Sequence, residues 1–164
     1  MAEQTRSERV ASALKRLAAS AANLTAASDE FSRPIVDLEA ALAKLDVGLI
    51  TWQRIAGGSD DFDNYWNRDV GYMRMEGKWR LVIRAVSGNP HVEDEDVDVW
   101  AFNDAPRSYR IEALDKLPDL LEELIKNADK TAKKLKETSA EARELASAAQ
   151  KAVNEFEQQR KGGS

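Results

Sequence analysis

Leucine, alanine and other apolar or small residues recur at alternating intervals of three and four near both ends of the chain. The first ladder runs from Val10 to Leu45 and the second from Leu114 to Phe156. This alternation is typical of helices that share one narrow seam with a partner helix. The pattern predicts helical arms at residues 1–46 and 106–161, followed by a flexible tail at residues 162–164.

One proline interrupts each predicted arm. The ladder keeps its phase across Pro34, which predicts a bent helix or two helices that share one seam. Pro118 predicts a short helix near Arg107 to Lys116 that turns into a long one, with Asp104 or Ser108 as a cap for the short helix.

The middle segment, residues 47–105, holds all four tryptophans and is predicted to form a β module. Two alternating runs between Val70 and Val86 flank Glu76-Gly77, which predicts a two-residue hairpin turn and so sets the register. Leu49 to Ala56 predicts an earlier strand and Asp96 to Phe102 a later one. A four-stranded antiparallel meander follows.

Together these elements predict an α+β fold in which two long terminal helices form an antiparallel coiled-coil hairpin around the meander. If the arms pair within one chain, Leu45 lies near Leu117 and Val10 lies near Phe156. The distal seam is rich in alanine, serine and threonine, which bury little apolar area, so a two-helix arm is expected to associate with a second copy.

The arms are therefore predicted to form a homodimer, in which the seam contains Leu14, Leu17, Leu24, Leu135, Leu145 and Phe156. The alternative is that the apolar positions of the arms pack on the β module of their own chain.

A second predicted surface lies on the outer face of the sheet. If Val97, Val99 and Ala101 point to the core, then Asp96 and Asp98 can meet arginines across the strands. The same assignment predicts an exposed partner-binding cluster of Met73, Arg80, Val82, Arg84, Trp100 and Phe102. The alternative is that the helix after Pro106 covers Trp100 and Phe102 with Tyr109, Ile111 and Leu114.

The composition and charge of the chain limit the kinds of site that it can contain. The chain has no cysteine and one histidine, His91, which excludes disulfides and any site that needs two histidines in one chain. The net charge of −5 lies mostly in the middle segment, so nucleic-acid binding is unsupported. The acidic stretches at Asp60 to Asp63 and Glu93 to Asp96 are interpreted as a solvated loop and an edge guard. No cofactor, metal site or membrane span is expected, and the predicted location is the cytoplasm.

These patterns favour a non-enzymatic interaction or scaffold protein whose arms oligomerise while the β module presents a face to an unidentified protein partner. The order of helix, β hairpins and helix resembles prefoldin and related coiled-coil chaperone subunits, and this resemblance implies a client-binding chaperone as one alternative. A further alternative is a small-ligand or enzyme module that uses Arg74, Arg80 and Arg84, which would require a pocket.

Overall fold

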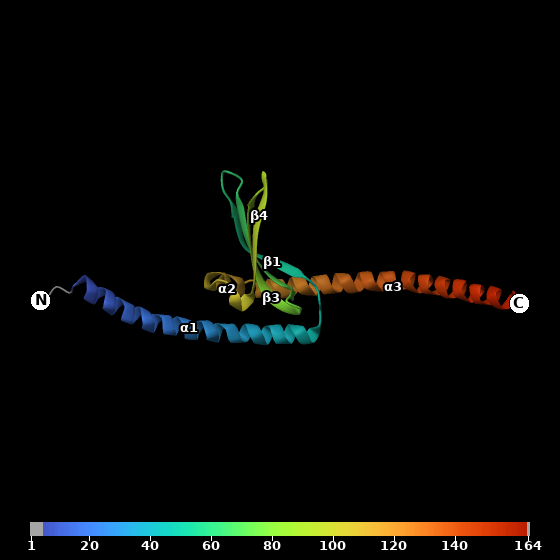
Figure 1. Cartoon of the computed structure of the whole chain (residues 1–164), viewed down its shortest axis with the longest axis horizontal. Coiled ribbons are helices and arrows are strands. Elements are labelled where there is room, and N and C mark those ends of the chain that lie inside the picture. The colour runs from blue at the N-terminus through green and yellow to red at the C-terminus, as the bar shows by residue number, and fades with distance from the viewer. Residues whose placement is uncertain (1–4, 164) are drawn as a thin grey trace. The chain divides into compact units, whose positions relative to one another are not determined.

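The computed structural model describes residues 5–163 and contains, in that part of the chain, three α-helices and one four-stranded antiparallel sheet (Figure 1). The predicted α+β class is confirmed, and long N- and C-terminal helices flank the sheet in chain order. The elements are α1 (Arg6–Leu45), β1 (Thr51–Ser59), β2 (Tyr65–Met75), β3 (Lys78–Asn89), β4 (Val92–Ala101), a 3-10 turn η1 (Phe102–Asp104), α2 (Arg107–Leu114) and α3 (Leu117–Gly162).

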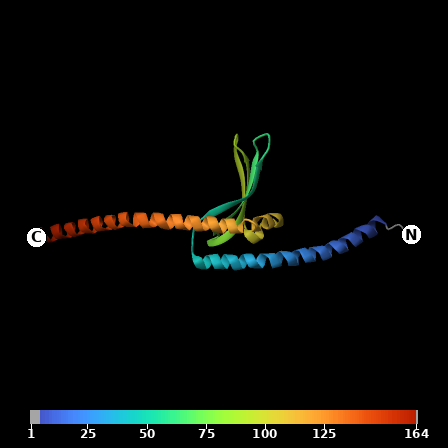
Figure 2. The same ribbon diagram turned by 180° about the vertical axis from the view of Figure 1, so that it is seen from behind.

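Helix α1 is one continuous element that contains Pro34 (Figure 2). Thr5 caps its first turn by accepting a hydrogen bond from the Glu8 N–H, while the Glu8 carboxylate accepts one from the Thr5 N–H. Asp46 ends the helix in the left-handed conformation, with a φ of 49°. Of the two predicted alternatives, one helix or two helices that share a seam, the structure shows one helix across Pro34.

The second interruption is also close to the prediction, since α2 ends at Leu114 and α3 begins at Leu117. Pro118 lies in the first turn of α3, where a missing N–H removes no intrahelical bond. Predicted capping of α2 by Asp104 or Ser108 is wrong, because no side chain of the described residues bonds the first turn of this helix.

The strands pair in the order β1-β2-β3-β4, which confirms the predicted meander. Glu76 and Gly77 form the turn between β2 and β3, with φ values of 50° and 81°. Positive φ at both central residues is typical of a type I′ turn, whose twist matches that of the two strands it joins. The predicted β2-β3 register is confirmed from Asp69↔Arg84 to Met75↔Lys78.

The strands extend further than the sequence indicates. Gly57 and Gly58 continue β1 past Ala56, where the predicted strand ends, and pair with Asn67 and Trp66. The actual β1-β2 loop is bonded to the β3-β4 turn, because the Asn89 side-chain amide donates to the Phe62 carbonyl at 3.0 Å and to the Asn64 side chain at 2.9 Å.

The buried side chains gather at the end of the sheet that carries the Glu76-Gly77 turn and the last residue of β4. They include Val70, Tyr72, Leu81, Val82, Ile83, Ala101 and Phe102 of the β module, together with Ile35 and Leu42 of α1 and Ala113 of α2. The other end of the sheet is exposed. The chain divides into two compact units, the first ending at Leu120 and the second beginning at Leu121. No helix among the described residues is long and apolar enough to cross a membrane.

Candidate functional site

The predicted partner-binding cluster does not form one exposed face. Val82 and Phe102 are 0% and 1% exposed, so both belong to the core of the module. Trp100 pairs with Ile83, whereas Val99 pairs with Arg84 and Ala101 with Val82. Trp100 therefore shares its face with Ile83 and lies on the opposite side of the sheet from Arg84. The expectation of a shared outer face is wrong. Partner binding by the four half-buried members, Met73, Arg80, Arg84 and Trp100, stays a prediction.

The error arises from the pattern of β4. Aspartate and valine alternate along residues 96–99, and the prediction directed the valines to the core. In the structure both Val97 and Val99 are exposed. Hydrophobic alternation cannot select a register where neither face is buried. Phe102 leaves the strand for η1 and is buried there rather than on a sheet face.

Helix α2 covers Trp100, which was the alternative interpretation. The Tyr109 ring meets the Trp100 ring edge-on, with 6.0 Å between centroids. Ile111 and Leu114, which were expected to share this role, are exposed. The buried residues of α2 are Arg110 and Ala113 instead.

Arg110 attaches α2 to α1. Its side chain donates to the Ser28 Oγ at 2.9 Å and to the Ser32 Oγ at 3.2 Å. Nearby, the Asn103 amide donates to the Ser32 carbonyl at 3.1 Å. The Arg110 guanidinium is therefore held by serine hydroxyls of α1.

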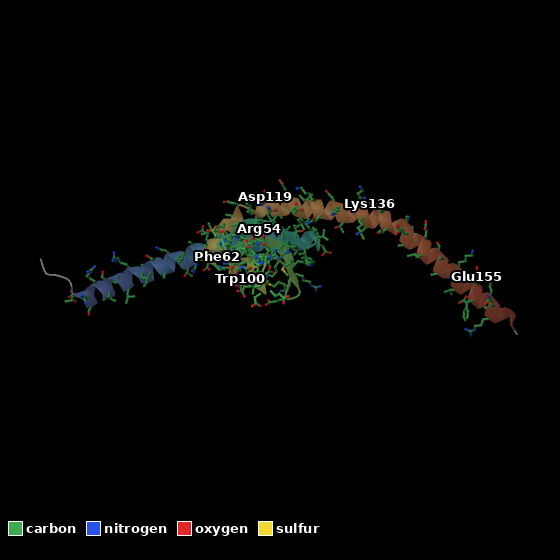
Figure 3. All side chains as sticks on the ribbon, turned by 90° about the horizontal axis from the view of Figure 1, so that it is seen from above. Arg54, Phe62, Trp100, Asp119, Lys136 and Glu155 are labelled. Carbon is green, nitrogen blue, oxygen red and sulfur yellow. The ribbon has the colours of Figure 1, made fainter. Side chains whose placement is uncertain are left out.

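Asp69 of β2 is the centre of a charged cluster on the other face of the sheet. Its carboxylate accepts a hydrogen bond from the Arg54 Nε at 2.5 Å and from the Arg84 Nη2 at 2.9 Å. The Arg84 guanidinium also lies 3.9 Å from the centre of the Trp52 ring. The predicted pairing of Asp96 and Asp98 with arginines of β3 is therefore wrong, because Arg84 is bonded to Asp69 and the two β4 carboxylates lie opposite Ser87 and Ala85. Figure 3 labels Arg54, the second arginine bonded to Asp69.

A groove of about 700 Å³ lies between α1 and the β2-β3 hairpin. Glu39 of α1 lines it and accepts a hydrogen bond from the Leu81 N–H at 2.9 Å, at a point where β3 has no β4 partner. Burial raises the pKa of Glu39, while the Leu81 N–H and the nearby Arg80 partly offset that rise. The Tyr72 and Trp79 rings stack in the same groove with their centroids 5.4 Å apart. The Arg74 Nε donates a hydrogen bond to the Gly77 carbonyl.

The ladder residues divide into a packed part and an exposed part. Ile35 and Leu42 of α1 are buried, so the interpretation that ladder positions pack on the module of their own chain holds for these two residues, whereas Leu45 is 70% exposed. The predicted oligomerisation residues are all at least half exposed, from 50% for Leu24 to 73% for Leu145, and comprise Leu14, Leu17, Leu24, Leu135, Leu145 and Phe156. Residues 6–27 of α1 and 132–162 of α3 are exposed throughout.

The acidic segments show no metal-binding geometry within residues 5–163. Asp60 instead organises its own loop by accepting hydrogen bonds from the backbone of Phe62 and Asn64 and from the Asn64 side chain. That side-chain bond is the largest contribution that lowers the pKa of Asp60. His91 lies on the surface, with its Nε2 3.0 Å from the Asp63 carboxylate.

The arrangement thus offers three surfaces that sequence reasoning described incompletely: the exposed arm seams, the groove beside Glu39, and the acidic outer half of the sheet. The groove beside Glu39 depends on contacts between α1 and the β2-β3 hairpin, so no local signal marks it, whereas the acidic residues of β4 are visible in the sequence. Comparison with protein-family models, curated proteins and solved structures finds no match to this chain.

Proposed function

We propose that the chain is a non-enzymatic scaffold protein that assembles as a homodimer through its helical arms and presents the β module to another protein. The observation that carries this proposal is the exposure of the leucine seams. Leu17 of α1 is 62% exposed and Leu135 of α3 is 65% exposed, although both lie in regular ladders that favour helix pairing.

The exposed helical segments need a partner for physical reasons. Residues 6–27 and 132–162 would span about 33 Å and about 46 Å at the rise of an α-helix. Most helical stability in proteins comes from packing of an apolar face against another element. A covered seam would stabilise these segments and remove leucines from water at about 25 cal/mol per Å².

A second copy is the occupant that the sequence of the seams favours. Pairing α1 with α3 as an antiparallel coiled coil would align the two ladders, but Ala21, Ala142, Ala149 and Ala152 contribute little buried area to it. Two such pairs that associate as a four-helix bundle would also cover Ile125 and Val153, which are 60% and 51% exposed. Dimerisation therefore supplies area that a single pair lacks.

The experiment compares a seam variant with a matched variant on the same helix. Leu135→Lys/Leu145→Lys places charges in the α3 seam, whereas Ala140→Lys/Ser147→Lys adds the same charges outside it. Light scattering after size-exclusion chromatography should give twice the chain mass for the wild type and the matched variant, and the chain mass for the seam variant. A wild-type monomer with full helical circular dichroism would refute arm-mediated assembly.

A second candidate, a prefoldin-like holdase, is favoured by one specific observation. Val10 and Phe156, near the ends of the two arms, are 58% and 62% exposed, as client capture at arm tips would require. Suppression of the aggregation of a model client, lost in Val10→Ser/Phe156→Ser and retained in Ala140→Lys/Ser147→Lys, would support this function over a scaffold role. Unchanged client aggregation in the presence of the wild type would eliminate it.

A further inference from the structure

Strand β4 is a regular and open edge of the sheet (Figure 1). It pairs only with β3, and its register is unbroken from Glu95↔Gly88 to Ala101↔Val82. Residues 92–99 are exposed throughout. The other edge strand, β1, has a register shift between Arg54 and Ala56, which makes it a poorer template. A long edge with unpaired backbone groups can accept an extended segment of another chain.

The side chains of this edge carry a single sign of charge. Glu93, Asp94, Asp96 and Asp98 all lie on β4, and no lysine or arginine occurs between residues 85 and 101. Within the described part of the chain, these four carboxylates make no ion pair or side-chain hydrogen bond. The negative charge of the edge is thus not neutralised inside the protein.

A groove beside the edge combines carboxylates with aromatic rings. It has a volume of about 310 Å³, and its lining includes Trp66, Arg68, Tyr109, Asp96 and Asp98. The register explains this grouping, because Trp66 and Asp96 lie in one cross-strand row with Ser87, and Arg68 and Asp98 lie in the next row with Ala85. Both carboxylates therefore lie on the face of the sheet that carries the rings.

The rings already hold one guanidinium. The Arg68 side chain lies 4.7 Å from the centre of the Trp66 ring and 4.6 Å from that of Tyr109, and it donates to the Glu112 carboxylate at 2.8 Å. Trp66 remains 42% exposed, so part of its surface is available to a second cation. Asp96 and Asp98 lie where such a cation would find charged acceptors.

We propose that the β4 edge and this groove bind an extended, basic segment of a partner protein, which adds a strand to β4 and places an arginine or lysine beside Asp96 and Asp98. The charge of the edge selects this occupant. Two β4 edges from separate copies would bring carboxylates together, and nucleic acid would place phosphates against them. The proposal extends the scaffold function by naming what the module binds, and it does not depend on arm assembly.

The test uses the full chain and a fluorescent heptapeptide of alternating arginine and valine, with binding followed by anisotropy at low salt. Saturable binding with one peptide per chain is expected. A version with N-methyl groups on alternate backbone amides keeps the charge but blocks strand pairing, and it should bind at least tenfold more weakly. A glutamate-valine peptide should show no saturable binding.

Paired protein variants separate the groove from general electrostatics. Asp96→Asn/Asp98→Asn should weaken binding of the arginine-valine peptide at least tenfold, whereas Asp29→Asn/Asp37→Asn, which removes the same charge from the exposed surface of α1, should change it less than threefold. Equal loss in both variants, equal binding of the N-methylated peptide, or no saturable binding by the wild type would each overturn the proposal. The mass of each variant, measured in parallel, shows whether arm assembly fails separately.

Discussion

Replacement of Asp69 by asparagine is the sharpest test of how the β module is stabilised. The Asp69 side chain is 4% exposed and receives hydrogen bonds from two arginines, of which Arg84 contributes both its Nε at 3.3 Å and its Nη2 at 2.9 Å. Asp69→Asn preserves the shape but removes the charge. It also replaces one acceptor oxygen with an NH2 group that faces a guanidinium donor.

The size of the effect follows from the exposure of the partners. Removal of one member of a fully buried ion pair costs about 3–5 kcal/mol, because the remaining charge is left unpaired. Here the Arg54 side chain is 54% exposed and that of Arg84 is 30% exposed. Both can recover hydration when the carboxylate is lost, so the expected loss of unfolding free energy is roughly half of that range, about 1.5–2.5 kcal/mol.

Urea unfolding monitored by tryptophan fluorescence measures this change directly. All four tryptophans lie in the β module, so the signal reports on this part of the chain. Urea is preferred to guanidinium chloride because salt would screen the cluster. The midpoint should fall by about 1 M for Asp69→Asn. Asp94→Asn is the matched control, since it makes the same change at an exposed position of β4. A difference below about 0.5 kcal/mol between the two variants would refute the reasoning.

Two further predictions concern the packing of the sheet and its edge. In Gly71→Ala, the added Cβ would lie 2.3 Å from Trp52 Cε3, so the ring must move; we expect a loss of roughly 1–3 kcal/mol in urea unfolding, and wild-type stability would contradict this contact. For Glu39, burial raises the folded-state pKa above the ordinary value of 4.5, so the folded state binds more protons and stability from this group falls as pH rises from about 4.5 through the folded pKa. Glu39→Gln keeps an acceptor for the Leu81 N–H and removes this titration, so its stability relative to the wild type should rise over that interval and then level off; a difference independent of pH would count against the assignment.

Some features of this protein followed from short stretches of sequence. The Glu76-Gly77 turn and its flanking runs predicted the β2-β3 register residue by residue, because a two-residue turn leaves one way to align the strands. The first ladder predicted the helical arm that α1 forms, and Pro118 predicted the break between α2 and α3. Helix periodicity and turn geometry are properties of neighbouring residues, and tertiary packing did not reverse them.

Other features depended on which surfaces meet. The register of β4 was predicted wrongly because its valines and aspartates both face water, so the pattern carried no information about the buried side. The burial of Phe102 and the contact of Arg110 with Ser28 and Ser32 likewise require α1, η1 and α2 to come together. The sequence alone determined the elements and the strongest hairpin, since these arise from local geometry. Only the tertiary structure decided which apolar and charged side chains remain exposed, because that depends on residues far apart in the chain.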